Sequence, residues 1–293
     1  MENTNFTDVQ SAFIKNITVK GFSSETIRSY KRDLDLFNKY LTRALNRSVY
    51  LEEVSVDDLE NYLQFLAEEK GLKASSRNRY FASVSSMFHY ALKKELIEKN
   101  PCDFIESAKV VESPKVTLDE DEIKQLLQAI DKPILRFAVL FLSKTGLRVS
   151  EMKNLTLSAV DLKSNKIHLF NTKGGKYRQI PIATTLRPHI LTYLKNVRKS
   201  ESEFFFATEK TGRLSSQYLN FELKKACRKL GWDRNITNHS IRRSFATNLL
   251  NRGANISTIQ RLLGHASLKT TSIYLNIVTA DLEAAVDLLD KEE

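Results

Sequence analysis

Apolar residues recur at the spacing of amphipathic helices along most of the chain, which predicts a mainly α-helical protein. The first part contains four such stretches, and the Asn100-Pro101 pair ends the fourth because a residue before proline disfavours the helical conformation. Ser55 and Asp58 form a candidate capping box at the start of the third. The predicted helices lie around residues 9–17, from Ser23 or Ser24 to about 41, from 55 to about 69 and from about 75 to 96. We expect the aromatic residues of these helices to form a core.

A second domain is predicted to begin near Leu118, after a linker in which Pro114 favours an extended backbone. Strand-like runs lie between about residues 159 and 182, and the Gly174-Gly175 pair predicts a hairpin between two of them, 166–170 and 177–182. The predicted helices of this domain cover 119–130, 133–144, 185–198, 215–230, 239–251, 256–263 and 279–290. The expected fold is a four-helix domain (1–108), a linker (109–117) and an α+β domain (118–293) with a small antiparallel sheet.

Side chains suited to chemistry on a phosphodiester gather near the end of the chain. His239 and Arg242 are three residues apart and share one face of a helix, His265 follows a helix stop, and Tyr274 comes nine residues later. Arginine and protonated histidine donate hydrogen bonds to phosphate oxygens as negative charge develops, and a tyrosine is a nucleophile once a neighbour removes its proton. Taken alone, a His-x-x-Arg pair is more often a surface pair, and a lone tyrosine usually packs in a core.

Two upstream elements favour the catalytic interpretation. Gly146 ends one predicted helix, Arg148 enters the next helix two residues later, and Glu151 lies one helical turn beyond Arg148. The predicted hairpin carries Lys173 at its tip. Lys176 lies on the same hairpin and could replace Lys173 if the register of the turn differs. Tyr177 is a second phenol there, but it lies on a strand and precedes the histidines, so Tyr274 is the preferred nucleophile.

In order and spacing, these motifs resemble the tyrosine recombinase (phage integrase) family. The matching pieces are Thr145-Gly-Leu-Arg-Val-Ser-Glu151, the hairpin Lys173, His239-x-x-Arg242, Leu263-Gly-His265 and Tyr274. The resemblance extends into the N-terminal helices and therefore covers nearly the whole chain. Because we expect no arm-binding domain before residue 6, the chain is most similar to Xer-like or transposon-resolvase-like members.

The resemblance implies a site-specific recombinase that cleaves and rejoins DNA through a 3′-phosphotyrosine and a Holliday junction, with no metal and no nucleotide cofactor. Tyr274 would be the nucleophile, His239 would take its proton, and Lys173 would protonate the 5′ leaving oxygen. The two arginines and His265 would donate hydrogen bonds to the non-bridging oxygens. The implied catalytic residues are Arg148, Lys173, His239, Arg242, His265 and Tyr274, with Glu151 in support.

The distribution of charge agrees with a polyanionic partner such as double-stranded DNA. The net charge is +10, and all of the excess lies in residues 111–293, because residues 1–110 contain 16 basic and 16 acidic side chains. The segment 52–69 carries seven acids and no base, so we expect it to face away from DNA. The N-terminal domain resembles the core-binding (SAM-like) domain of the family. Its candidate DNA-contacting residues are Arg28, Lys73, Arg77 and Arg79.

Several further expectations concern location and assembly. The chain has no long apolar run and no signal-peptide core, and Cys102 and Cys227 have no metal-ligand spacing, so we expect a cytosolic, reduced protein without a membrane span. The predicted helix 279–290 has one apolar and one acidic face, which suits a protein partner better than DNA. The resemblance favours docking of this segment on a neighbouring subunit, in a homotetramer on two paired sites, alone or with a related second recombinase.

Two other functions fit parts of the pattern. A type IB topoisomerase would use the same tyrosine chemistry on one strand, and a catalytically silent DNA-binding regulator would use the same scaffold. The four-helix domain and the terminal segment argue against the first, and the full set of implied catalytic residues argues against the second. The sequence does not distinguish integration of an element from cointegrate resolution or chromosome dimer resolution.

Overall fold

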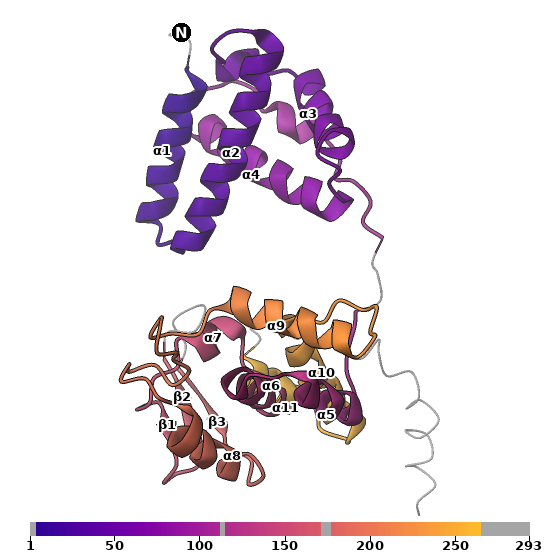
Figure 1. Cartoon of the computed structure of the whole chain (residues 1–293). Coiled ribbons are helices and arrows are strands. Elements are labelled where there is room, and N and C mark those ends of the chain that lie inside the picture. Colours follow the sequence, from indigo (N-terminus) through magenta and orange to yellow (C-terminus); the bar gives the residue numbers. More distant parts are fainter. Residues whose placement is uncertain (1–3, 112–114, 171–176, 265–293) are drawn as a thin grey trace, which may run out of the picture. The chain divides into compact units, whose positions relative to one another are not determined.

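The computed structural model describes residues 4–111, 115–170 and 177–264. The chain forms two compact units, Met1–Ser113 and Pro114–Glu293, each with its own hydrophobic core (Figure 1). The described residues are mainly helical, and the sheet that they form has three antiparallel strands. The predicted fold class is therefore confirmed.

Four helices build the N-terminal unit, as the apolar periodicity predicts. Ser23 rather than Ser24 caps the second helix, and the capping box of Ser55 and Asp58 opens the third. Short 3-10 turns at Leu51–Glu53 and Pro101–Phe104 follow the second and fourth helices. The helices are α1 (Phe6–Val19), α2 (Ser24–Leu45), α3 (Val56–Glu68) and α4 (Ala74–Lys93).

Aromatic side chains occupy the centre of this unit. The ring of Phe37 lies 5.8 Å from that of Phe6 and 4.7 Å from that of Tyr62, and all three are fully buried. The prediction of an aromatic core is confirmed for these residues. Tyr80 differs, because it is only partly buried and the guanidinium group of Arg79 lies 4.1 Å from its ring centre.

The C-terminal unit is built around one apolar helix, α6 (Pro133–Thr145), which packs against α5 (Glu120–Ala129) and α10 (Asn238–Asn251). Figure 1 shows these helices at the middle of the unit, with α9 along one side and the sheet and α8 at one end. Phe137 and Phe141 of α6 are buried among the aromatic rings of Tyr193, Phe205 and Phe206. The other helices among the described residues are α7 (Val149–Lys153), α8 (Arg187–Thr192), α9 (Ser216–Lys229) and α11 (Ile256–Leu263).

The sheet has the order β1 (Val160–Asp161), β2 (Lys166–Leu169) and β3 (Arg178–Pro181). Strands β2 and β3 pair antiparallel, as predicted for the two arms of the hairpin, and Leu169 lies opposite Arg178 where the described strands end. The tip of this hairpin, residues 171–176, lies outside the described residues.

The predicted helix over 185–198 is confirmed from Arg187 to Val197, although its second half is not an α-helix. After α8 the chain continues as a π-helical turn, Tyr193–Val197. The buried side chain of Tyr193 stacks on Phe137 at 4.5 Å, and its hydroxyl donates a hydrogen bond to the carbonyl of Phe205 at 2.9 Å. These tertiary contacts accompany the wider turn, and nothing in the local sequence predicts them.

Candidate active site

Two helix ends meet where the structure places Arg148. Helix α6 ends at Gly146 with φ of +61°, and a Cβ atom there would also overlap the ring of Phe245 on α10. Arg148 then lies just before α7 rather than within it, and its backbone N–H donates to Oε2 of Glu151 at 2.8 Å. The backbone of Arg148 is thus fixed by a carboxylate one turn ahead.

Helix α10 carries Arg242 into the interior of the unit. The residue is 5% exposed, and its two terminal nitrogens donate to the carbonyl oxygens of Gly146, at 2.5 Å, and Leu263, at 2.7 Å. These carbonyls belong to the ends of α6 and α11, so one guanidinium group joins the ends of two helices. Arg242 is therefore held in place by backbone atoms far apart in the sequence.

The carboxylate of Glu151 is the centre of the site. Arg148 Nη1 donates to its Oε1 at 2.9 Å, and Arg178 donates from both terminal nitrogens, each at 2.9 Å, to its two oxygens. Arg242 Nη1 lies 3.9 Å from Oε2. The carboxylate is only 9% exposed. We define this group as the Glu151 cluster: Arg148, Glu151, Arg178 and Arg242.

Electrostatics keep Glu151 charged. Burial alone would raise the pKa of its carboxyl group, but the charge of Arg178, the N–H of Arg148 and their hydrogen bonds outweigh burial, so the pKa lies below its ordinary value. Three guanidinium groups around one carboxylate leave a net charge of +2 in a partly buried region. Such a region favours a phosphate group, since each arginine is always protonated.

His239 lies in the first turn of α10, on its exposed side. Partial burial of the ring lowers its pKa from 6.5, and the positive charges of Arg242, Arg243 and Arg148 lower it further. Near neutral pH the imidazole is therefore uncharged, and in that form it accepts a proton. The structure thus brings Arg148, Arg242 and His239 together, as the sequence predicts.

Four predicted residues, Lys173, Lys176, His265 and Tyr274, lie outside the described residues. The chain is described up to Gly264, which ends α11 with φ of +65°, as predicted. The carbonyl of Gly264 accepts a hydrogen bond from Arg148 Nη2 at 3.2 Å, so the residue before His265 contacts the Glu151 cluster.

Sequence reasoning missed Arg178. One signal was available: Arg178 lies two residues before the buried Ile180, and residues two apart point to the same face of a strand. A charged residue on the buried face needs a partner, and that partner is Glu151, 27 residues earlier.

Tyr177, the alternative phenol, is 52% exposed, and its hydroxyl is hydrogen-bonded to His168 and Gln179.

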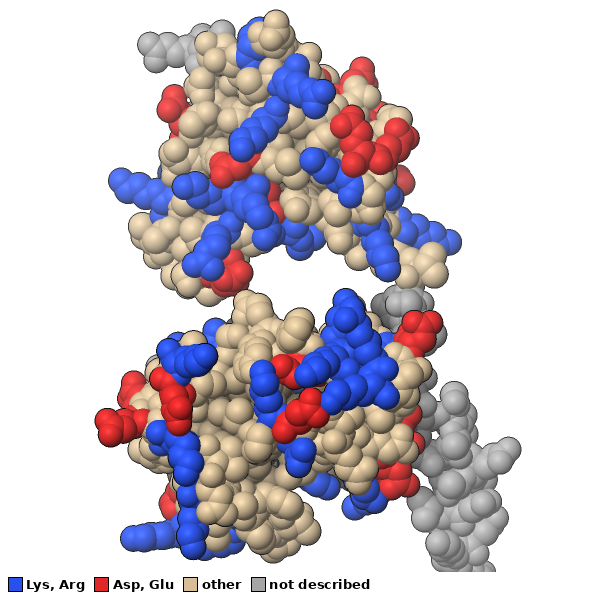
Figure 2. Space-filling model, in the orientation of Figure 1, with Lys and Arg blue, Asp and Glu red and all other residues tan. Residues whose placement is uncertain are grey.

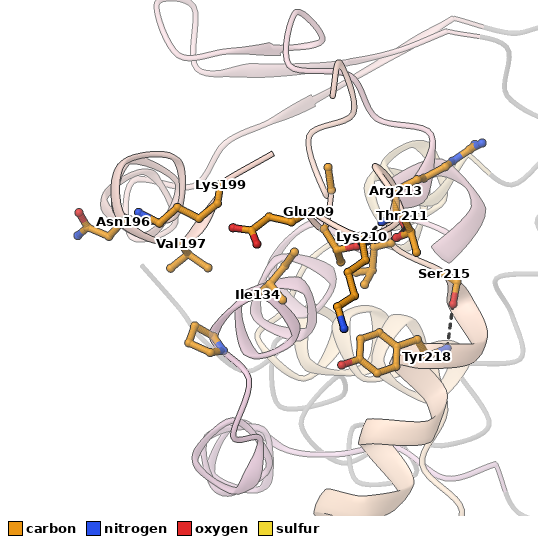
Figure 3. A pocket seen from close by; sticks show the side chains of 14 residues that line it. Ile134, Asn196, Val197, Lys199, Glu209, Lys210, Thr211, Arg213, Ser215 and Tyr218 are labelled. Carbon is orange, nitrogen blue, oxygen red and sulfur yellow. Dashed lines mark hydrogen bonds between the residues drawn. The ribbon is translucent and has the colours of Figure 1, made fainter. Parts of the chain in front are cut away.

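A cavity of about 660 Å³ lies elsewhere in this unit (Figure 3). It lies between the start of α6, the π-helical turn and the start of α9, and its described lining includes none of the predicted catalytic residues. Within the described part of the chain, no group of three or more His, Cys, Asp or Glu side chains is placed to hold a metal ion. The Glu151 cluster is therefore the candidate site.

The N-terminal unit contains a second group of arginines around a carboxylate. Asp33 of α2 is fully buried, and it accepts hydrogen bonds from Arg79 and Ser83 of α4 and from its neighbour Arg32. The side chain of Arg79 is 43% exposed and that of Arg32 is 63% exposed, so both positive charges are accessible to solvent. We define this group as the Asp33 cluster: Arg32, Asp33, Arg79 and Ser83.

The other predicted DNA-contacting residues lie on the same two helices or at their ends. Arg28 of α2 pairs with Glu25 at 2.9 Å, and both side chains are exposed. Lys73 directly precedes α4, and Arg77 in its first turn donates to the carbonyl of Leu72 at 3.3 Å. Figure 2 shows basic side chains across the visible face of this unit, with acidic ones gathered in the region of α3. Among the residues that the structure describes, no helix is long and apolar enough to cross a membrane.

Comparison with known proteins agrees with both units. Residues 116–280 match the model of the phage integrase family, and residues 12–95 match that of the phage integrase N-terminal SAM-like domain. The tyrosine recombinase XerA of Pyrococcus horikoshii is 33% identical, over 96% of this chain and 93% of its own. The tyrosine recombinase XerD of Shewanella oneidensis is 29% identical, over 93% of each chain.

Solved structures give the same fold. The crystal structure of XerA recombinase matches 98% of this chain and 99% of its own, with 26% identity and a TM-score of 0.53. The integrase of transposon Tn1549, in complex with a circular intermediate DNA, matches 99% of this chain and all of its own, with a TM-score of 0.77 at 22% identity. Since the family model spans more than half of the chain and a relative sharing a third of its residues extends over almost all of it, the chain belongs to the phage integrase family of tyrosine recombinases.

Proposed function

We propose that the protein is a site-specific DNA recombinase in which the Glu151 cluster binds the scissile phosphate and Tyr274 attacks it. The observation that supports this proposal most is the partly buried group of three arginines around one carboxylate, in contact with the residue before His265. A phosphodiester gains negative charge on its non-bridging oxygens in the transition state, and preorganised donors stabilise that charge.

Each predicted residue then has one task. The phenolate oxygen of Tyr274 forms a bond to phosphorus, and the bond from phosphorus to the 5′ oxygen breaks. His239 takes the phenol proton, and Lys173, or Lys176 in its place, gives a proton to the leaving oxygen. Arg148, Arg242 and His265 donate hydrogen bonds to the non-bridging oxygens. The phosphotyrosine keeps the energy of the ester, so rejoining needs no nucleotide.

We expect the reaction to need no metal ion, because arginine, lysine and histidine supply all the positive charge and none of the six catalytic residues is a carboxylate. Cleavage should therefore persist in excess chelator. If added Mg²⁺ restores activity lost to a chelator at constant ionic strength, the metal-free assignment is wrong.

Double-stranded DNA is the proposed partner, with Arg28, Lys73, Arg77 and Arg79 as contacts to its backbone in the N-terminal unit. Related folds support such a partner: a lambda integrase dimer bound to a COC′ core site and a tetramer bound to a Holliday junction have TM-scores of 0.77 and 0.75. For this chain we propose a homotetramer on two paired sites, alone or with a second recombinase, in which residues 279–290 dock on a neighbouring subunit.

A covalent adduct tests the proposal directly. The target site is first selected from a random duplex library by binding, and a nicked duplex with that site is then incubated with the protein. Trapping of DNA on the native chain and loss of trapping in Tyr274→Phe, with site binding retained, is the expected result. Tyr177→Phe is the matched control and should still form the adduct. Adduct formation by Tyr274→Phe would assign the nucleophile elsewhere, and no adduct with the native chain would favour a silent DNA-binding regulator. Relaxation of supercoiled DNA by a monomer without a target site would favour a topoisomerase.

A further inference from the structure

Arg178 makes two side-chain hydrogen bonds to Glu151, yet it belongs to none of the catalytic motifs. Its side chain is 12% exposed, and it approaches the carboxylate with two parallel hydrogen bonds of 2.9 Å. We infer that Arg178 is a positioning residue, which holds the Glu151 carboxylate in the orientation that places Arg148 and Arg242 for the reaction. This inference rests on the proposed function.

Arg178 and Arg148 bond to the same carboxylate oxygens of Glu151, so Arg178 acts on Arg148 through Glu151. Oε1 of Glu151 accepts from both Arg148 Nη1 and Arg178 Nη1. Oε2 accepts from the backbone N–H of Arg148 and from Arg178 Nη2, and it is the oxygen nearest Arg242. Two parallel bonds fix the plane of a carboxylate, whereas one bond leaves it free to rotate. Without Arg178, the carboxylate keeps its bonds to the backbone N–H and Nη1 of Arg148, and it loses the two bonds that come from a separate strand.

Arg178 also packs against the helix end that leads to His265. A Cβ atom on Gly264 would lie 2.8 Å from Cζ of Arg178, so a larger residue there would displace the guanidinium group. The same Gly264 accepts the hydrogen bond from Arg148 Nη2. Arg178 therefore contacts two of the groups that hold Arg148, from a strand that neither of them belongs to.

Geometry, rather than charge, distinguishes Arg178 from a lysine at this position. A lysine would keep the positive charge, but its single ammonium group does not form two parallel bonds to a carboxylate. A misplacement of about 1 Å at a reacting group costs on the order of 10²-fold in rate. Arg178→Lys should therefore retain the net charge of the site and lose much of the rate.

The test compares Arg178→Lys and Arg178→Ala with Arg187→Lys, a matched control whose guanidinium group bonds to Leu162 and Asn165 at the far end of the sheet. Adduct formation is measured in single turnovers at saturating protein on the nicked substrate. We expect both Arg178 variants to be slowed by about 10- to 100-fold, with site affinity within about threefold of native, and the control to be unchanged. An Arg178→Lys rate within about threefold of native would overturn the inference.

A second substrate separates positioning from general damage to the fold. A methylphosphonate at the scissile position replaces one charged oxygen by a methyl group, so it depends less on arginine donors than a phosphate does. The loss caused by Arg178→Lys should shrink on this substrate, as should the loss caused by Arg148→Ala. An equal loss on both substrates, accompanied by a lower melting temperature, would assign Arg178 a structural role only. Failure of the native chain to form an adduct on either substrate would instead refute the proposed function.

Discussion

The Asp33 and Glu151 clusters both hold arginine side chains around one carboxylate, and they differ in how far those side chains are exposed to solvent. In each, a buried carboxylate receives guanidinium groups from other parts of its unit. Around Asp33 the arginine side chains are 43% and 63% exposed, whereas around Glu151 they are 29%, 12% and 7% exposed. Water screens the first set and largely leaves the second unscreened. The more exposed arginines of the Asp33 cluster suit contact with a DNA backbone that passes over the surface. The less exposed arginines of the Glu151 cluster suit a single phosphate on which negative charge builds up in the transition state.

The two buried carboxylates orient arginine side chains rather than stabilise the fold. A buried ion pair adds little stability compared with apolar packing, because removing both charges from water is costly. What the carboxylate does supply is a fixed direction for the arginine that it holds. The comparison therefore separates binding at the Asp33 cluster from chemistry at the Glu151 cluster, and the following experiments test that separation.

The largest expected effect concerns the hairpin that leads into Arg178. Lys173→Ala should slow cleavage by about 10²–10⁴-fold, the usual contribution of a general acid, with little change in affinity. The loss should shrink on a substrate with sulfur at the 5′ bridging position, because thiolate leaves without protonation. If sulfur rescues Lys176→Ala and not Lys173→Ala, the two lysines exchange roles.

A smaller loss of cleavage rate is expected when an arginine of the Glu151 cluster is replaced by lysine, which keeps the charge and changes the geometry. Arg242→Lys keeps the charge but does not reach both carbonyls and the phosphate, so cleavage should fall by about 10²–10³-fold. Arg252→Lys is the control on the same unit, since Arg252 forms an exposed pair with Glu120 at the end of α10. Single-turnover rates and melting curves of both variants provide the measurement. Native cleavage by Arg242→Lys would show that charge alone suffices.

The smallest effect is a shift in pH dependence. In the proposed mechanism His239 must be neutral to take the tyrosine proton. Because its pKa lies below 6.5, the rate should fall only as the pH drops below that value. Arg243 is one of the charges that lower this pKa, and its removal should raise it. In Arg243→Gln the acid limb of the cleavage rate should therefore move to higher pH. An unmoved limb would indicate that another group acts as the base.

The sequence predicts local features of this protein better than contacts across the fold. Helix ends at Ser55, Gly146 and Gly264 are predicted correctly because capping depends on a few adjacent residues. The meeting of Arg148, Arg242 and His239 is predicted only through the family motifs, since nothing local brings them together.

Contacts between distant segments were not predictable in this way. The bond between Arg178 and Glu151 joins a strand to a helix, and Asp33 of α2 receives Arg79 from α4, 46 residues later. On a helix, an aspartate resembles any solvated polar residue until its neighbours are known. The π-helical turn after α8 likewise accompanies contacts of the buried Tyr193 with distant residues.

One experiment tests the separation of the two clusters most directly: affinity and single-turnover adduct formation measured on the same nicked site for Asp33→Asn and Glu151→Gln. Asp33→Asn should weaken affinity by about tenfold, equivalent to ~1.4 kcal/mol, and should leave the rate at saturating protein unchanged. Glu151→Gln should slow adduct formation by about 10²-fold and should leave affinity within about threefold of native. Glu53→Gln, at the exposed pair with Arg47, controls for the loss of a carboxylate and should change neither quantity. Loss of affinity alone in Asp33→Asn, with loss of rate alone in Glu151→Gln, would support separate roles for the two clusters. A loss of affinity in both variants, or a loss of rate in both, would contradict them.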